Sequence, residues 1–336
     1  LWRWKRQSRP SALPAERLTG AMQAGLRYVR HAPILQAVFM RTIVFMSGAS
    51  ALWALLPVVA RLELNLTATG YGALLGCMGV GAIAGGLAIP RVRQHLSTNQ
   101  MALLASILFA VATLALAYLR HPIGLGMMLM LAGLAWTTTM VSLNVSVQLA
   151  VPTWVQARSL GIYQLTFMGS MAIGSFIWGV VAEYLGNSTA LTLAAIGLVV
   201  GLIAALRYPL GAGERLDLAP AHHWGEPAVV IDLRPEDGPV LVTIEYRIDP
   251  TQADEFTVIM QDLRIVRRRD GAIRWGLFCD TADASRYLET FIVDSWAEHL
   301  RQHERFTNTD RTIESHAKSF HIGDRPPEVS HLIYAR

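Results

Sequence analysis

Polar and aromatic side chains inside long apolar stretches are the residues of this sequence best placed to do chemistry. Arg41 lies about eight residues into the first such stretch, where a cation is costly unless it meets protein, water or an anion. Two interpretations stand. Arg41 either faces a central cavity and pairs with an anionic substrate or with an acid of other helices, or it snorkels to the nearby membrane interface.

Amides and indoles form a second candidate group. Asn144 and Gln148 are one helical turn apart near the end of the fourth apolar stretch, and Gln164 lies in the first turns of the fifth. We expect these three to meet at one membrane face, either as a polar gate or as interhelical hydrogen bonds. Trp53 and Trp136 fall nearer the bilayer centre, where they either line a path for a ring-bearing substrate or pack in the core.

Candidate ionisable groups are few. Proton coupling needs an ionisable group in the pathway, and Glu183, at the end of the fifth stretch, is the candidate, with a helix-end interfacial role as its alternative. His299 and His303 are one turn apart near the C-terminus. Two histidines without a third ligand do not define a metal site, so we expect a surface or dimer contact, no metal, no cofactor and no catalytic constellation.

Composition places the chain in a membrane. Of its 336 residues, 52% are hydrophobic and 16% charged, with a mean hydropathy of +0.35, values typical of a membrane protein. Residues 1–210 hold 14 bases and 3 acids, a net charge of +11, and residues 211–336 hold 15 bases and 22 acids, a net charge of −7. The overall charge therefore describes neither part and gives no reason to expect a nucleic-acid partner.

Six apolar stretches are long enough to cross a hydrocarbon core of about 30 Å. They cover residues 34–59, 70–89, 100–119, 123–149, 159–182 and 188–206. The links between them are too short for a soluble domain. The fold class expected for residues 34–206 is therefore an all-α bundle of six transmembrane helices, with the lipid bilayer as its partner.

Basic residues predict the orientation of this bundle. With the N-terminus inside, only Arg61 and Arg120 lie in the outer loops, and twelve bases lie on the inner side: Arg3, Lys5, Arg6, Arg9, Arg17, Arg27, Arg30, Arg91, Arg93, Arg158, Arg207 and Arg215. Positive charge accumulates on the cytoplasmic side. We therefore expect a multi-pass protein of the plasma (inner) membrane with both termini in the cytoplasm.

Residues 152–164 (PTWVQARSLGIYQ), continuing to Gly179, resemble the link between helices ten and eleven of major facilitator efflux proteins, specifically the enterobactin-exporter-like branch. The resemblance extends over about residues 34–206. It implies twelve spans in two halves with substrate between them, so this chain would be helices seven to twelve, completed by a missing N-terminal half or a second copy. It also implies that residues 1–33 are the end of a central cytoplasmic loop. Its loop motifs fall on Arg91, Arg93, Pro152, Trp154 and Arg158, although no acid lies beside Arg91 and Arg93.

The C-terminal part is expected to be soluble. Residues 207–238 are predicted to form a linker. Residues 239–336 are predicted to form, in order, a strand, a helix, two strands, a helix and a strand, which is the βαββαβ order of ferredoxin-like domains. Residues 291–303 resemble antibiotic-biosynthesis-monooxygenase-like domains, which pair into dimers. The three arginines at 267–269 are interpreted as a solvated face, near anionic lipid headgroups.

Two functions follow from these observations. The first is a transporter that exports a small amphipathic molecule, siderophore-like or drug-like, by alternating access, with proton coupling as an option and no enzyme activity. The alternative is an enzyme or regulator in which the helices tether the C-terminal domain to the membrane.

Overall fold

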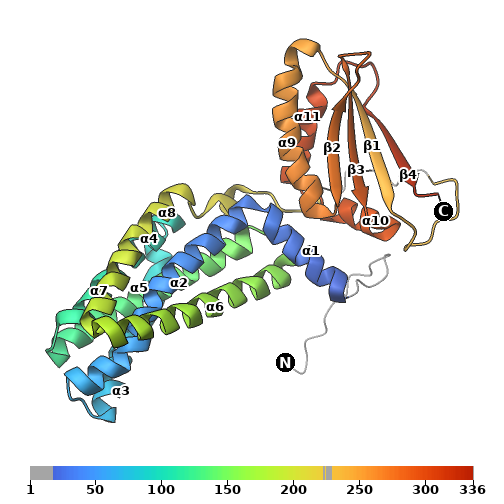
Figure 1. Ribbon diagram of the computed structural model, residues 1–336. Helices are drawn as coiled ribbons and strands as arrows, with labels where there is room; N and C mark the ends of the chain where they lie inside the picture. Colours follow the sequence, from blue (N-terminus) through green and yellow to red (C-terminus); the bar gives the residue numbers. More distant parts are fainter. Residues whose placement is uncertain (1–17, 222–223, 225–228, 336) are drawn as a thin grey trace, which may run out of the picture. The chain divides into compact units, whose positions relative to one another are not determined.

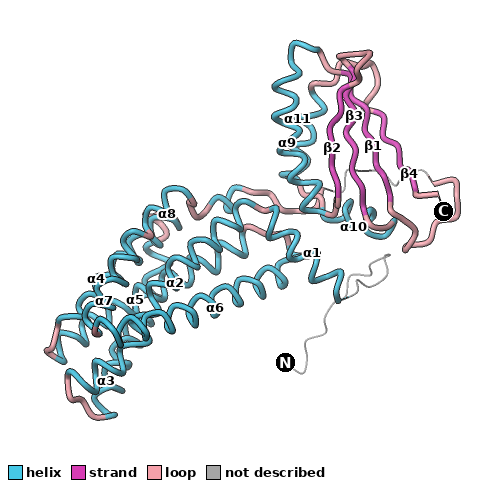
Figure 2. Tube along the Cα trace, in the orientation of Figure 1, coloured by secondary structure: helices cyan, strands magenta, loops and turns pink. Residues whose placement is uncertain are grey.

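The computed structural model describes residues 18–221, 224 and 229–335. It consists of two compact units. One contains residues 33–216, and the other joins the described residues before position 33 to those after position 216. Figures 1 and 2 show a wholly helical first unit and, in the second, helices packed on one small sheet.

The first unit, called here the membrane unit, contains six helices long and apolar enough to cross a membrane, as predicted. Its elements follow each other through short loops: α2 (Pro33–Val58) running into the π-helical turn η1 (Val59–Glu63), α3 (Ala68–Val92), α4 (Thr98–Tyr118), α5 (Pro122–Leu149), α6 (Thr153–Leu185), α7 (Asn187–Val200) and α8 (Leu202–Arg207). Local chemistry fixes several starts. Ser97 caps α4 in a capping box with Gln100, and Pro122 opens α5, where a missing N–H costs nothing.

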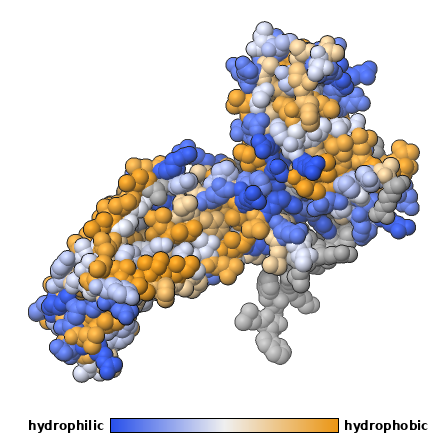
Figure 3. Space-filling view, viewed as in Figure 1, coloured by the Kyte–Doolittle hydropathy of each residue, from blue (hydrophilic) through white to orange (hydrophobic). Residues whose placement is uncertain are grey.

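Small residues let these helices approach closely. A Cβ added to Gly81 or Gly133 would collide with the backbone at Met130 or Met78, so α3 and α5 touch almost backbone to backbone. Gly72 and Gly76, also on α3, face open space instead. Apolar side chains also cover much of the face of this unit that Figure 3 shows, as lipid or further helices require.

The second unit, called here the tail unit, is built on a four-stranded antiparallel sheet. Its strands are β1 (Val240–Arg247), β2 (Arg274–Cys279), β3 (Arg286–Val293) and β4 (Glu328–Ile333), in the order β2-β3-β1-β4. Helices α9 (Ala253–Asp270), α10 (Trp296–Arg305) and α11 (Asn308–Ser319) interrupt them. Buried residues alternate along β1, and the inward set packs on α9 and α11 residues such as Phe256 and Ala317. The Ser295 side chain caps the start of α10.

Arg267 corrects the interpretation of the 267–269 run as a solvated face. Its side chain is 1% exposed and donates to Glu289 of β3 at 3.1 Å and to Glu314 of α11 at 3.2 Å. Burial alone lowers the pKa of Arg267, but the two carboxylates outweigh burial and raise the pKa above its ordinary value. The carboxylates come from elements distant in sequence, so the run by itself could not show this pairing.

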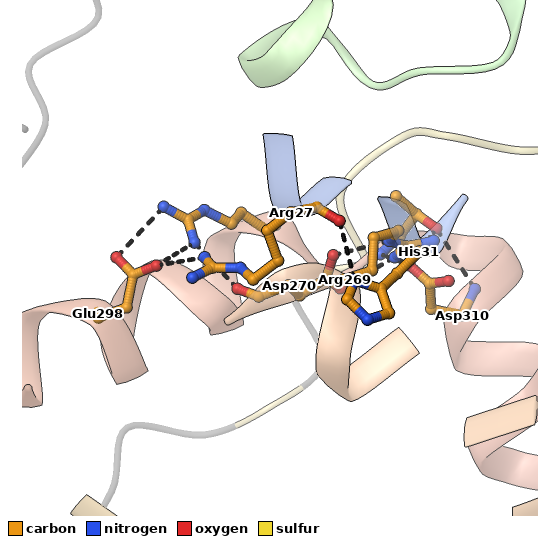
Figure 4. Close-up of polar contacts among 8 residues, drawn as sticks. Arg27, His31, Arg269, Asp270, Glu298 and Asp310 are labelled. Atoms are coloured by element: carbon orange, nitrogen blue, oxygen red, sulfur yellow. Dashed lines mark hydrogen bonds and ion pairs between the residues drawn. The ribbon is translucent and has the colours of Figure 1, made fainter. Parts of the chain in front are cut away.

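Helix α1 (Leu18–His31) belongs to the tail unit rather than standing alone as a basic segment. Arg27 of α1 donates to Glu298 of α10 at 2.8 Å (Figure 4). Arg305 donates to the same carboxylate at 2.6 Å. Tyr28 is buried beneath Arg269, whose guanidinium lies 5.2 Å from the ring centre, and burial raises the Tyr28 pKa. Segments before the first span and after the last span therefore fold together.

Candidate functional site

An aromatic cluster occupies the interior of the membrane unit. Trp136 of α5 is its centre, with ring centroids 5.3 Å from Trp53 and 6.2 Å from Phe45, both on α2. Phe109 of α4 lies at 5.9 Å and Phe167 of α6 at 6.2 Å. Four helices thus meet at one indole. Sequence placed Trp53 and Trp136 near the same depth, and the structure brings them into edge-to-face contact.

Both tryptophans are only partly buried, although they touch the fully buried core. The Trp53 indole N–H is shielded from solvent and has no hydrogen-bond partner among the described residues. A buried donor without an acceptor is costly and calls for an explanation. The cluster can therefore offer aromatic faces and one indole donor to a molecule beside it.

Arg41 is buried at 6% exposure, and its guanidinium donates to the Asn99 side-chain oxygen at 3.1 Å. That oxygen also accepts the Leu210 backbone N–H at 3.2 Å. Arg41 therefore joins α2 to α4 and to the chain that leaves the last span. Asn99 lies at the start of α4 and Leu210 follows α8, so both interpretations of Arg41, cavity-facing and interfacial, stay predictions.

The predicted amide group is only partly assembled. Gln148 donates to the Asn144 side-chain oxygen at 2.6 Å along α5. Gln164 is exposed on α6, and no hydrogen bond joins it to this pair within the described part of the chain. A polar pair on one helix is thus present, whereas the three-residue gate is not formed.

The basic loop between α3 and α4 has an acidic partner that was not identified from the sequence. Arg91 and Arg93 are exposed near the end of α3. Arg93 lies 3.7 Å from Glu214, whose carboxylate also accepts the Thr98 hydroxyl at 2.6 Å. Glu214 follows the last span, about 120 residues after Arg93 in the chain, so no local motif could reveal it.

The second loop motif lies at the start of α6. Pro152 is buried at the N-cap position of that helix, and Trp154 and Arg158 are partly buried in its first turns. These residues fix how the chain passes from α5 to α6.

A second ionic group joins the opposite helix ends. Glu63 pairs with Arg120 and accepts the Asn187 side-chain N–H at 2.8 Å. Arg120 also donates to the Ala117 carbonyl at 2.8 Å. Glu183, the predicted coupling candidate, is exposed instead. The membrane unit is therefore clamped by polar contacts at both ends, with aromatic rings between them.

In the tail unit, His299 is 2% exposed. The expected surface or dimer-contact role is therefore wrong for this residue. Helix α10 packs against the sheet, and the His299 side chain lies on the face of α10 that points toward it.

The comparison with protein families gives one finding that spans the chain. The family model described as transmembrane secretion effector (MFS_3) matches residues 1–336. The search of curated proteins gave no match.

Proposed function

Because the chain belongs to the transmembrane secretion effector family, a group of major facilitator-like membrane transporters, we propose that it exports a small amphipathic molecule by alternating access. Family membership indicates a membrane transporter and not an enzyme. The substrate class rests on the site. Siderophore-like or drug-like compounds with aromatic rings fit the chemistry of the cluster around Trp136.

The aromatic cluster is the observation that carries this proposal. Trp136 holds rings from three other helices around it and remains partly exposed. Offset and edge-to-face aromatic contacts stabilise by about 0.5–1.5 kcal/mol each, enough to bind a ring without tight shape selection. The unpartnered indole N–H of Trp53 supplies a donor for a carbonyl or hydroxyl of the substrate.

Orientation is supported by the tail unit. Helix α1 precedes the first span, α9 follows the last, and both pack in one unit, so both ends of the six spans must share a compartment. The positive-inside rule assigns that compartment to the cytoplasm, since twelve basic residues lie on that side and two on the other. The proposed location is the plasma membrane.

Two lightly buried helices support the need for further helices. In the most apolar part of each span, 22% of the residues of α3 and 11% of those of α6 are buried, compared with 61% in the span formed by α2 and η1. On α3, Gly72, Gly76 and Gly79 face open space, which would allow another helix to approach closely. We place a second six-helix half there, either from the same polypeptide or from another copy. The enterobactin-exporter-like branch is the relative that the loop motifs favour.

The tail unit is proposed to be ferredoxin-like, because its β2-β3-β1-β4 order and antiparallel pairing suit that topology. The sheet face opposite α9 and α11 carries apolar side chains. Leu241 is paired with Ile292 and Leu332 across this face, and Leu332 is 53% exposed. A second tail unit covering it would give the dimer seen in monooxygenase-like domains.

Export of a fluorescent aromatic compound from cells that carry the intact protein tests the proposed function. Trp136→Ala should lower efflux at least tenfold, whereas Tyr184→Ala, at an α6 position 79% exposed, should leave it within about twofold. Deleting residues 239–336 should preserve most efflux. If the deletion abolished the function of the protein while Trp136→Ala left efflux unchanged, the helices would instead be an anchor for the C-terminal domain.

A further inference from the structure

Three histidines meet in the tail unit. His299 and His303 lie one turn apart on α10, and His331 lies on β4. One ring nitrogen from each falls within 4.8 Å of the others. The ring centroid of His299 is 4.7 Å from that of His303 and 4.8 Å from that of His331. The third ligand absent from the α10 pair in the sequence is therefore present in the fold.

The register of the sheet explains this meeting. His331 is paired with Val242 of β1, and directly paired residues point to the same face of a sheet. Val242 is buried in the tail core, so His331 also points to the helix-covered face, where α10 presents His299. Val329 and Ile333 share that face by alternation. A histidine thus stands where the pattern of the strand calls for an apolar residue.

The buried position of His299 suits metal binding. His299 is 2% exposed, and neither of its ring nitrogens has a hydrogen-bond partner within the described residues. A buried polar atom without a partner calls for an explanation. A metal ion bound by the ring would supply that partner.

The donor set selects the class of ion. It consists of imidazoles alone, without the carboxylate and carbonyl oxygens that Ca²⁺ and Mg²⁺ prefer. Imidazole suits Zn²⁺, Cu²⁺ and Ni²⁺. Metal–nitrogen bonds of about 2.0–2.1 Å in a tetrahedral site place the ligand nitrogens roughly 3.3 Å apart. The three histidine nitrogens lie within 4.8 Å of one another, so the side chains must rotate slightly toward each other when the ion binds.

We propose that His299, His303 and His331 bind one divalent transition-metal ion, with Zn²⁺ as the ion that fits best. Three protein ligands leave a fourth position for water or another small ligand. A cavity of about 160 Å³ reaches His331, with Trp296 also in its wall, and gives such a ligand access. Nothing in the transport proposal requires this site, so each stands or fails separately.

Metal titration of the intact protein tests the proposal. Purified protein in detergent, stripped by a chelator, is titrated with Zn²⁺ by calorimetry and with Co²⁺ by visible absorption. We expect one ion per chain, tetrahedral Co²⁺ bands and a higher unfolding temperature of the tail unit. Loss of a residue that contacts a metal only through its ligands lowers metal affinity by about 10–100-fold. His303→Ala and His331→Ala each remove a direct ligand, so each should weaken binding by at least this factor.

His316→Ala is the matched control, because His316 is exposed on α11 outside the cluster and its loss should leave binding unchanged. Circular dichroism of each variant separates ligand loss from misfolding, and His331→Gln keeps a polar side chain of similar reach if the alanine variant does not fold. Absence of saturable binding at one ion per chain overturns the site, as does equal affinity in the His331 variants and the wild type.

Discussion

Replacing Arg267 by methionine probes the ionic core of the tail unit. The substitution keeps much of the side-chain volume and removes a buried cation that bridges Glu289 and Glu314 at 3.1 and 3.2 Å. These carboxylates are 0% and 3% exposed, so solvent cannot replace the lost partner. Breaking a buried ion pair by removing one member costs about 3–5 kcal/mol, and two carboxylates left together place Arg267→Met at the upper end.

Hydrogen exchange of the intact protein measures this effect locally. Peptides from β1 and β3 should exchange faster by roughly 1,000-fold or more, because each 1.4 kcal/mol of opening free energy is a factor of about ten. Peptides of the membrane unit should be unchanged.

Arg264→Met is the matched control on the same helix, because Arg264 is exposed and surface substitutions change stability by about 0.5 kcal/mol or less. A second arm replaces Arg267, Glu289 and Glu314 together by apolar residues, which should recover most of the loss. Equal protection in Arg267→Met and Arg264→Met would refute the conclusion that a buried ionic core holds the sheet to α9 and α11.

Three further outcomes are expected. Burial raises the pKa of Glu298, but Arg305 and Arg27 outweigh burial and lower this pKa below its ordinary value. The ionised Glu298 therefore stabilises the docking of α1 at pH values above the ordinary carboxyl pKa of 4.5, and this stabilisation is lost as the pH falls below that value. Glu298→Gln should abolish this pH dependence, measured as hydrogen exchange of α1. Gly81→Leu should destabilise the membrane unit in detergent melts by about 1–3 kcal/mol or more, the cost of an overpacked core, whereas Gly197→Leu, at an exposed α7 position with open space around it, should not. Arg41→Ala should lower both melting temperature and efflux, and unchanged efflux would remove Arg41 from the transport path.

Local signals made the membrane unit predictable. Each span is a continuous apolar run, and the structure extends the predicted runs by only a few residues, as from 159–182 to Thr153–Leu185. Strand β1 was equally clear, because its alternation is visible in eight consecutive residues. Hydropathy and alternation are properties of one segment, so a single sequence is enough to find them.

Pairings between distant segments were not predictable. Glu214 reaches Arg93 across four helices, and Glu63 reaches Arg120 and Asn187 from different loops. The run at 267–269 looked solvated because its carboxylate partners lie on β3 and α11. One signal was available, however: His331 interrupts the apolar face of a predicted strand and could have been matched to the two histidines of α10.

Transport by the purified protein tests the central claim most directly. The intact protein, reconstituted in liposomes loaded with a fluorescent aromatic compound, should release that compound faster than empty liposomes, and Trp136→Ala should remove most of this difference while Tyr184→Ala keeps it. Release equal to that of empty liposomes, with a correctly folded and inserted protein and across a panel of amphipathic compounds, would contradict the assignment of this chain as an exporter.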